Sequence, residues 1–132
     1  MSRVSVRYIV DDVPAAISFY CQRLGFVEEM HPAATFAIVT RQELRLLLSA
    51  PSAQAGGGQV LEGSAHPVPG GWNRISLQVD ELDQLVDRLR REGVTCRTPI
   101  IDGVGGRQVI VDDPSGNPVE LFQPKLDQAR NG

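Results

Sequence analysis

The chain has 132 residues, of which 42% are hydrophobic and 22% charged, and its formal net charge is −3. This size and apolar content suit one compact domain or two small halves that share a core. The slightly acidic balance does not favour binding to nucleic acid, which needs clustered Lys and Arg, and no apolar stretch approaches the roughly 20 residues of a membrane-spanning helix.

The N-terminal residues and the two cysteines indicate the compartment. "MSRVSVRYIV" lacks the apolar core and the cleavage site of a signal peptide. Cys21 and Cys96 form neither a metal-binding spacing nor a disulfide framework. We therefore expect a cytoplasmic protein with two buried free thiols.

Residues 1–50 are predicted to form a strand, a helix and three further strands. Alternation divides the side chains of the first strand, "VSVRYIV", between two faces: Val4, Val6, Tyr8 and Val10 on one, and Ser5, Arg7 and Ile9 on the other. Asp11 or Asp12 can cap the next helix, Pro14 suits its first turn, and Gly25 is expected just beyond its end. The predicted apolar stripe of this helix consists of Ile17, Tyr20, Cys21 and Leu24. The further strands are "FVEEMH", "TFAIVT" and "ELRLLLSA".

Residues 51–71 and 72–124 are predicted to be a linker and a second unit. The first stretch is rich in Gly, Pro, Ser and Ala, which is typical of a linker or mobile loop. In the second, "NRISLQV" predicts a strand, "DELDQLVDRLRREG" a helix, and "VTCRTPII", "RQVIVDD" and "PVELFQ" three strands. The apolar stripe of the helix consists of Leu82, Leu85, Val86 and Leu89. The basic run "DRLRREG" is interleaved with acids and predicts a solvated helix face.

Three shorter segments complete the second half. "GVGGR" at 103–107 stands between two strands, which favours a hairpin over a phosphate-binding loop. "DPSGNP" is a strong turn signal between the last two strands. The polar tail at 125–132 is expected to fray.

The same order of elements thus occurs twice, at an offset of about 68–69 residues. Each half is too small to be stable alone. The predicted fold class is α+β, with two tandem βαβββ half-domains whose curved mixed sheets surround a ligand cleft. The halves could pair within one chain or between the chains of a dimer.

Three segments carry a resemblance to a known family. They are "VDDVPAAISFYCQRLGF", "VDELDQLVDRLRREGV" and, as the most specific, "GRQVIVDDPSGNPVELFQP". In these the chain resembles, over residues 4–124, the vicinal oxygen chelate superfamily. That superfamily includes glyoxalase I, extradiol dioxygenases, fosfomycin-resistance enzymes and bleomycin-resistance proteins. The resemblance implies a divalent metal held in the cleft by the first strand of each half and by a Glu of a last strand.

The ligand positions implied by the resemblance fall on Ser5, near Leu47, on Arg74 and on Glu120. Only Glu120 is a usual ligand, since Ser5 is a poor donor and the fixed charge of Arg74 would repel a cation. His31 and His66 lie outside these positions. We therefore predict that the metal site is lost and that no cofactor is bound.

Strand alternation indicates what replaces the metal. It places Ser5, Arg7 and Ile9 on the cleft side, together with Arg74, Ser76, Gln78, Glu120 and Phe122. We predict that the Arg74 guanidinium pairs with Glu120, with Arg7 as an alternative partner, because an unpaired carboxylate in a partly buried cleft is costly. The sequence leaves two roles open for this pair: it can hold the two halves together, or it can bind the ligand.

Aromatic side chains extend the predicted site. Phe36, Trp72 and Phe122 could reach the cleft and suit a planar ligand, although Trp72 could instead cover the edge of the core. The predicted ligand-binding residues are Ser5, Arg7, Phe36, Trp72, Arg74, Ser76, Gln78, Glu120 and Phe122. No catalytic residue is predicted, since the chain has no Ser/His/Asp or Cys/His arrangement.

The resemblance favours a metal-free small-molecule-binding protein of the bleomycin-resistance type, which sequesters an aromatic or antibiotic-like ligand. The alternative is a metal-dependent lyase, isomerase or dioxygenase that uses Glu120. A metal-free enzyme with Glu120 as general base is a narrower variant, and an arginine beside a carboxylate makes it a weaker base. A third candidate is a metabolite-binding domain for regulation or transport. We expect a homodimer, with no nucleic-acid or membrane partner.

Overall fold

The computed structural model describes residues 3–52, 58–59, 63 and 66–125. The chain divides into two compact units, Met1–Gly70 with Pro114–Asn117 and Gly71–Asp113 with Pro118–Gly132. Much of the predicted linker, and the predicted fraying tail after Lys125, lie outside the described residues. Within the described ranges no helix is long and apolar enough to cross a membrane.

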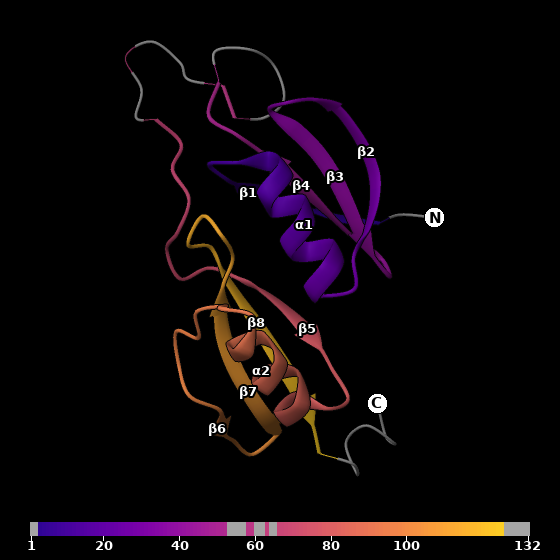
Figure 1. Cartoon of the computed structure of the whole chain (residues 1–132), viewed down its shortest axis with the longest axis vertical. Coiled ribbons are helices and arrows are strands. Elements are labelled where there is room, and N and C mark those ends of the chain that lie inside the picture. The colour runs from indigo at the N-terminus through magenta and orange to yellow at the C-terminus, as the bar shows by residue number, and fades with distance from the viewer. Residues whose placement is uncertain (1–2, 53–57, 60–62, 64–65, 126–132) are drawn as a thin grey trace. The chain divides into compact units, whose positions relative to one another are not determined.

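The first unit has the predicted βαβββ order (Figure 1). Its elements are β1 (Val4–Ile9), α1 (Val13–Arg23), β2 (Val27–Ala33), β3 (Phe36–Arg41) and β4 (Leu44–Ser49). The sheet order is β1-β4-β3-β2, with β1 parallel to β4 and the other neighbours antiparallel. The helix α1 covers one face of this sheet.

The predicted ends of α1 are confirmed. The Asp12 carboxylate accepts a hydrogen bond from the backbone N–H of Ala15 at 3.0 Å, and Pro14 lies in the first turn. Just beyond the helix, Gly25 has a φ of +77°, in the left-handed region where glycine is favoured. The backbone then turns back, and the N–H of Phe26 donates to the carbonyl of Tyr20.

The predicted apolar stripe of α1 is partly wrong. Its buried residues are Val13, Ala16, Phe19 and Tyr20, whereas Ile17 and Cys21 are only half-buried. The rings of Phe19, Tyr20 and Phe26 pack edge to face, with centroids 5.0 and 5.4 Å apart. This aromatic cluster rotates the buried face toward Phe19, because aromatic rings bury more area than the side chains of Ile17 and Cys21.

The second unit also has two layers, with α2 over one face of its sheet (Figure 1). Its elements are β5 (Ile75–Gln78), α2 (Leu82–Arg91), β6 (Ile101–Asp102), β7 (Gly106–Asp112) and β8 (Pro118–Pro124). The sheet order is β5-β8-β7-β6, with β5 parallel to β8. The predicted GVGGR hairpin joins β6 to β7, and the N–H of Gly103 donates to the carbonyl of Gly106.

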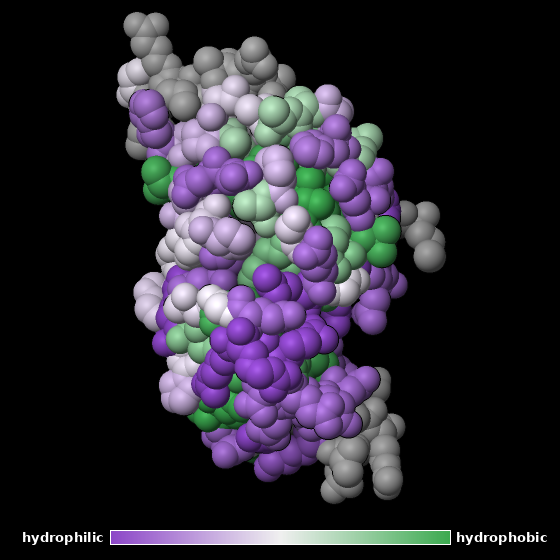
Figure 2. All heavy atoms as spheres, viewed as in Figure 1, coloured by the Kyte–Doolittle hydropathy of each residue, from purple (hydrophilic) through white to green (hydrophobic). Residues whose placement is uncertain are grey.

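The two faces of α2 match the prediction from its sequence. Leu82, Val86 and Leu89 are buried, while Leu85 is half-buried. The opposite face is solvated, and Figure 2 shows hydrophilic side chains gathered over α2. The basic run therefore lies on the solvated face of this helix, as predicted.

The strand predicted over residues 94–101 is wrong except at Ile101, which begins β6. Cys96 makes one isolated bridge to Val111, and regular pairing begins only at the two-residue β6. The N–H groups of Arg97 and Thr98 both donate to the carbonyl of Ile110, and the Thr98 hydroxyl accepts from the N–H of Ile110. Pro99, which follows, has no N–H to continue the ladder. This irregular segment brings the Arg97 side chain to the end of β7.

The turn between β7 and β8 is confirmed at "DPSGNP" and packs in the first unit. The Asn117 side chain is buried, donates to the carbonyl of Ile9 at 2.8 Å and accepts from the N–H of Gly70 at 2.8 Å. The Ser115 hydroxyl accepts from the N–H of Asp11 at 2.8 Å. These contacts fix the residues between β1 and α1.

Both cysteines are free thiols, as predicted, but each is only half-buried. Burial raises the pKa of the Cys21 thiol, and the nearby charge of Glu28 raises it further. Cys21 therefore stays protonated at neutral pH and is a poor nucleophile.

In each unit the sheet has a face that its own helix covers and an opposite face, here called the open face. Strand alternation separates them: in the second unit Val119 and Leu121 are fully buried, while Glu120 and Phe122 between and beyond them are partly exposed. The register of the first sheet places Ser5, Arg7, Ile9, Phe36, Ile38, Thr40, Arg45, Leu47 and Ser49 on its open face.

Candidate functional site

The open face of the second sheet centres on Glu120. This residue pairs with Ser76 in the parallel register of β5 and β8. Its Oε1 accepts from the Nε of Arg74 at 3.1 Å and lies 3.1 Å from Nη2, and its Oε2 accepts from the Ser76 hydroxyl at 2.8 Å. The predicted Arg74–Glu120 pair is therefore present.

This pair is partly shielded from water. The side chain of Arg74 is 28% exposed and that of Glu120 17% exposed. Both carboxylate oxygens have a donor, so the charge of Glu120 is satisfied by the chain itself. The pair holds Arg74, just before β5, against Glu120 in β8.

The donors at the family's ligand positions do not fit a divalent metal. The Glu120 oxygens are occupied by a guanidinium and a hydroxyl, and an arginine stands where a ligand would be needed. The corresponding positions of the first unit hold Ser5, which is a weak metal ligand, and Leu47, which has no atom that can bind a metal. Within the residues that the structure describes, no group of three His, Cys, Asp or Glu side chains could hold a metal ion.

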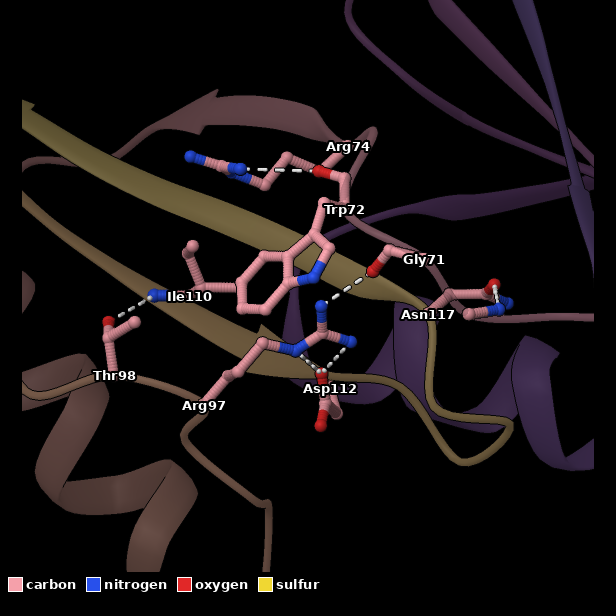
Figure 3. A network of polar contacts seen from close by, with 9 residues as sticks. Gly71, Trp72, Arg74, Arg97, Thr98, Ile110, Asp112 and Asn117 are labelled. Carbon is pink, nitrogen blue, oxygen red and sulfur yellow. Dashed lines mark hydrogen bonds and ion pairs between the residues drawn. The ribbon is translucent and has the colours of Figure 1, made fainter.

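The indole of Trp72 lies against an arginine that the sequence did not single out (Figure 3). The guanidinium carbon of Arg97 is 4.5 Å from the ring centroid. Arg97 donates from Nε to the Oδ1 of Asp112 at 3.0 Å, with Nη2 at 2.9 Å, and from Nη1 to the carbonyl of Gly71 at 2.6 Å. The ion pair therefore fixes the cation on which the indole rests.

Trp72 also connects to the Glu120 cluster. Arg74 donates from Nη1 to the Trp72 carbonyl at 3.2 Å, as Figure 3 shows. The residue is 63% exposed, so it does not plug the core. The ring rests on the Arg97 guanidinium and is open to solvent, so it is available for contact with a flat ligand.

The other predicted residues of this unit also lie on the open face. Gln78 is the register partner of Phe122 between β5 and β8. Gln78 is exposed and Phe122 is half-buried. Together with Trp72 and the Glu120 cluster, they give a surface of mixed aromatic and polar groups.

The remaining predicted residues lie on the open face of the first sheet. Ser5 and Arg7, on β1, are exposed and pair with Arg45 and Leu47 of β4, while Phe36 is half-buried on β3. His31 and His66 are exposed.

A second charged cluster, which the sequence reasoning missed, occupies this face. The Glu29 carboxylate accepts from Arg3 at 2.8 Å and from Arg45 at 3.0 Å. The hydrogen bond from Arg3, followed by that from Arg45, holds the pKa of Glu29 below its usual value. Arg45 could have been placed from the parallel pairing of β1 and β4, but the register shifts of β2 hid Glu29.

The two-layer βαβββ unit, present twice, defines the vicinal oxygen chelate class of fold. The family model for the Glyoxalase/Bleomycin resistance protein/Dioxygenase superfamily matches residues 3–121, and the chain belongs to this superfamily. No curated protein is significantly similar to it.

Solved structures agree with this assignment. A superfamily member from Sphaerobacter thermophilus DSM 20745 is 28% identical, with a TM-score of 0.72 and coverage of 93% of this chain and 97% of that chain. TnmS3, an antibiotic binding protein from Streptomyces sp. CB03234, is 25% identical, with a TM-score of 0.68 and coverage of 95% and 98%. Lactoylglutathione lyase from Agrobacterium tumefaciens shares the fold at 20% identity, with a TM-score of 0.71 and coverage of 92% of both chains.

Proposed function

We propose that the protein is a metal-free small-molecule-binding protein that sequesters an aromatic or antibiotic-like ligand. The proposed binding residues are Ser5, Arg7, Phe36, Trp72, Arg74, Ser76, Gln78, Glu120 and Phe122. As part of the same proposal, the protein acts in the cytoplasm as a homodimer, since two-fold dimers are the commonest oligomers.

One observation carries the proposal. The only usual metal ligand among the family positions is Glu120, and both of its oxygens are hydrogen-bonded to Arg74 and Ser76. A cation would have to displace a fixed positive charge from a carboxylate that is 17% exposed. The exposed ring of Trp72 supports the proposal that the ligand is flat. The similarity to TnmS3, an antibiotic binding protein, supports the proposal that the ligand is antibiotic-like.

Metal content tests the first half of the proposal. The untagged protein is incubated with Mn²⁺, Fe²⁺, Co²⁺, Ni²⁺ and Zn²⁺ salts, desalted, and its metal counted per chain by mass spectrometry. We expect near-zero occupancy for every ion. About one ion per chain, lost in Glu120→Ala, would overturn the proposal and favour a metal-dependent lyase, isomerase or dioxygenase.

Ligand screening tests the second half. Trp72 is the only tryptophan, so its fluorescence reports directly on this surface. We expect saturable changes with members of a panel of aromatic antibiotics, and calorimetry should show weaker binding in Trp72→Ala than in the control Arg90→Ala on the solvated face of α2. Equal affinities in the two variants would remove Trp72 from the site.

A further inference from the structure

The open face of the first sheet joins an apolar area to a cationic edge. Its apolar side chains are Ile9, Phe36, Ile38 and Leu47. Ile38 is 5% exposed and the other three are half-buried, so the area is a packed floor rather than loose side chains. Arg7 stands beside this floor, as the register partner of Leu47. Arg45 lies on the same face, two residues before Leu47 in β4.

The charges on this face do not balance. Arg3 and Arg45 share the single carboxylate of Glu29. Arg7 is exposed and, within the described residues, has no ion-pair partner. The cluster therefore keeps two positive charges that no carboxylate of the cluster neutralises, which raises the local concentration of anions.

Arg45 also has unused hydrogen-bonding capacity. Its Nη2 donates to Glu29, but its Nε is buried and has no acceptor among the described residues. A buried donor without an acceptor is uncommon and costs free energy. Guanidinium groups bind carboxylate, sulfonate and phosphate oxygens in a planar, directed way, and a rotation of the Arg45 side chain would turn its Nε toward such an anion.

We propose that Arg7 and Arg45 form an anion-binding subsite, so that the ligand is an apolar or aromatic molecule carrying a carboxylate, sulfonate or phosphate group. The apolar body lies on the floor of Ile9, Ile38 and Leu47, and the anion lies between the two guanidinium groups. This inference rests on the proposed function and specifies the chemistry of its ligand.

Two fluorescent probes that differ only in the anion test the subsite. They are 1-anilinonaphthalene-8-sulfonate and N-phenyl-1-naphthylamine, which is the same molecule without the sulfonate. The folded wild-type protein should bind the sulfonate at least about tenfold more tightly, as expected for charge-assisted hydrogen bonds. Raising NaCl from about 0.05 to about 0.5 M should weaken only the sulfonate, because screening acts on the charged probe.

Substitution locates the effect. Arg7→Gln and the double variant Arg7→Gln/Arg45→Gln should lose the preference for the sulfonate stepwise, with the affinity for the neutral probe unchanged. The control Arg90→Gln removes an equal charge from the solvated face of α2 and should behave as wild type. Circular dichroism checks that each variant is folded, and the exposed Arg7 provides a test even if the double variant unfolds.

The outcomes separate this inference from the proposed function. Equal affinity of wild type for the two probes, or a sulfonate preference that survives Arg7→Gln and the double variant, would overturn the subsite while metal-free binding still stood. Binding of neither probe would overturn the subsite too, and the metal count and antibiotic screen would still decide the proposed function. A bound metal would overturn the proposed function without changing the probe preference.

Discussion

Removing Arg74 should measurably destabilise the fold. Arg74→Ala deletes two contacts of 3.1 Å to Glu120 and one of 3.2 Å to the Trp72 carbonyl, and leaves the carboxylate with only the Ser76 hydroxyl. Exposed ion pairs contribute about 0.2–1 kcal/mol, and hydrogen bonds to charged groups about 1.5–3 kcal/mol. Side chains that are 28% and 17% exposed lie between these cases. We expect a loss of about 1–2 kcal/mol in the free energy of unfolding.

A double-mutant cycle isolates the pair itself. Urea unfolding of wild type, Arg74→Ala, Glu120→Ala and the double variant, followed by far-ultraviolet circular dichroism, should give a coupling energy of about 1 kcal/mol. The matched control is the cycle on Arg88 and Glu92, an exposed i,i+4 pair at 4.0 Å, for which we expect at most about 0.5 kcal/mol. A coupling energy below about 0.3 kcal/mol for Arg74 and Glu120 would refute the argument that this pair replaces a metal.

Three further predictions concern other parts of the chain. Gly106→Ala should lower the free energy of unfolding by at least about 2 kcal/mol, because the φ of Gly106 is +157° and an added Cβ would collide with the backbone of β8. The control Gly103→Ala in the same hairpin should leave the stability nearly unchanged. Equal unfolding midpoints for the two variants would contradict this prediction. Hydrogen bonds from arginines lower the pKa of Glu29 below its ordinary value of 4.5, so they stabilise the folded protein at pH values above 4.5. This stability is lost as the pH falls through the lower pKa of the folded state. In urea unfolding, wild type should therefore lose more stability below pH 4.5 than Glu29→Gln does. Arg97→Met should make Trp72 more accessible to acrylamide quenching, and an unchanged quenching constant would show that Arg97 does not hold the indole.

Patterns that depend on neighbouring residues predicted much of the fold. Alternation in β1 and β5, the cap at Asp12 and the positive φ at Gly25 are local features, and each appears as the sequence indicates. The pairing of Arg74 with Glu120 was also predictable, because the parallel pairing of a first and a last strand places alternate residues on one face.

Features that depend on irregular backbone were not predictable. Arg97 reaches Asp112 because residues 94–100 do not form a strand, and periodicity carries no information about such a segment. Glu29 contacts Arg45 from β2, whose pairing with β3 contains register shifts, so the alternation of side chains between the two faces does not predict this contact. The residues missed in both units are charged residues whose partners are set by tertiary structure alone.

The carboxylates on the open faces of the two sheets are neutralised differently. A carboxylate on the open face of a sheet needs a cation, and in the second unit Arg74 supplies one charge to Glu120, which leaves that pair neutral. In the first unit Glu29 meets Arg3 and Arg45 on a face that also carries Arg7, so two positive charges remain. A guanidinium, unlike a metal ion, offers no open coordination position, and it binds oxyanions through directed hydrogen bonds. The net positive charge on the open face of the first sheet therefore supports the proposed recognition of an anionic ligand.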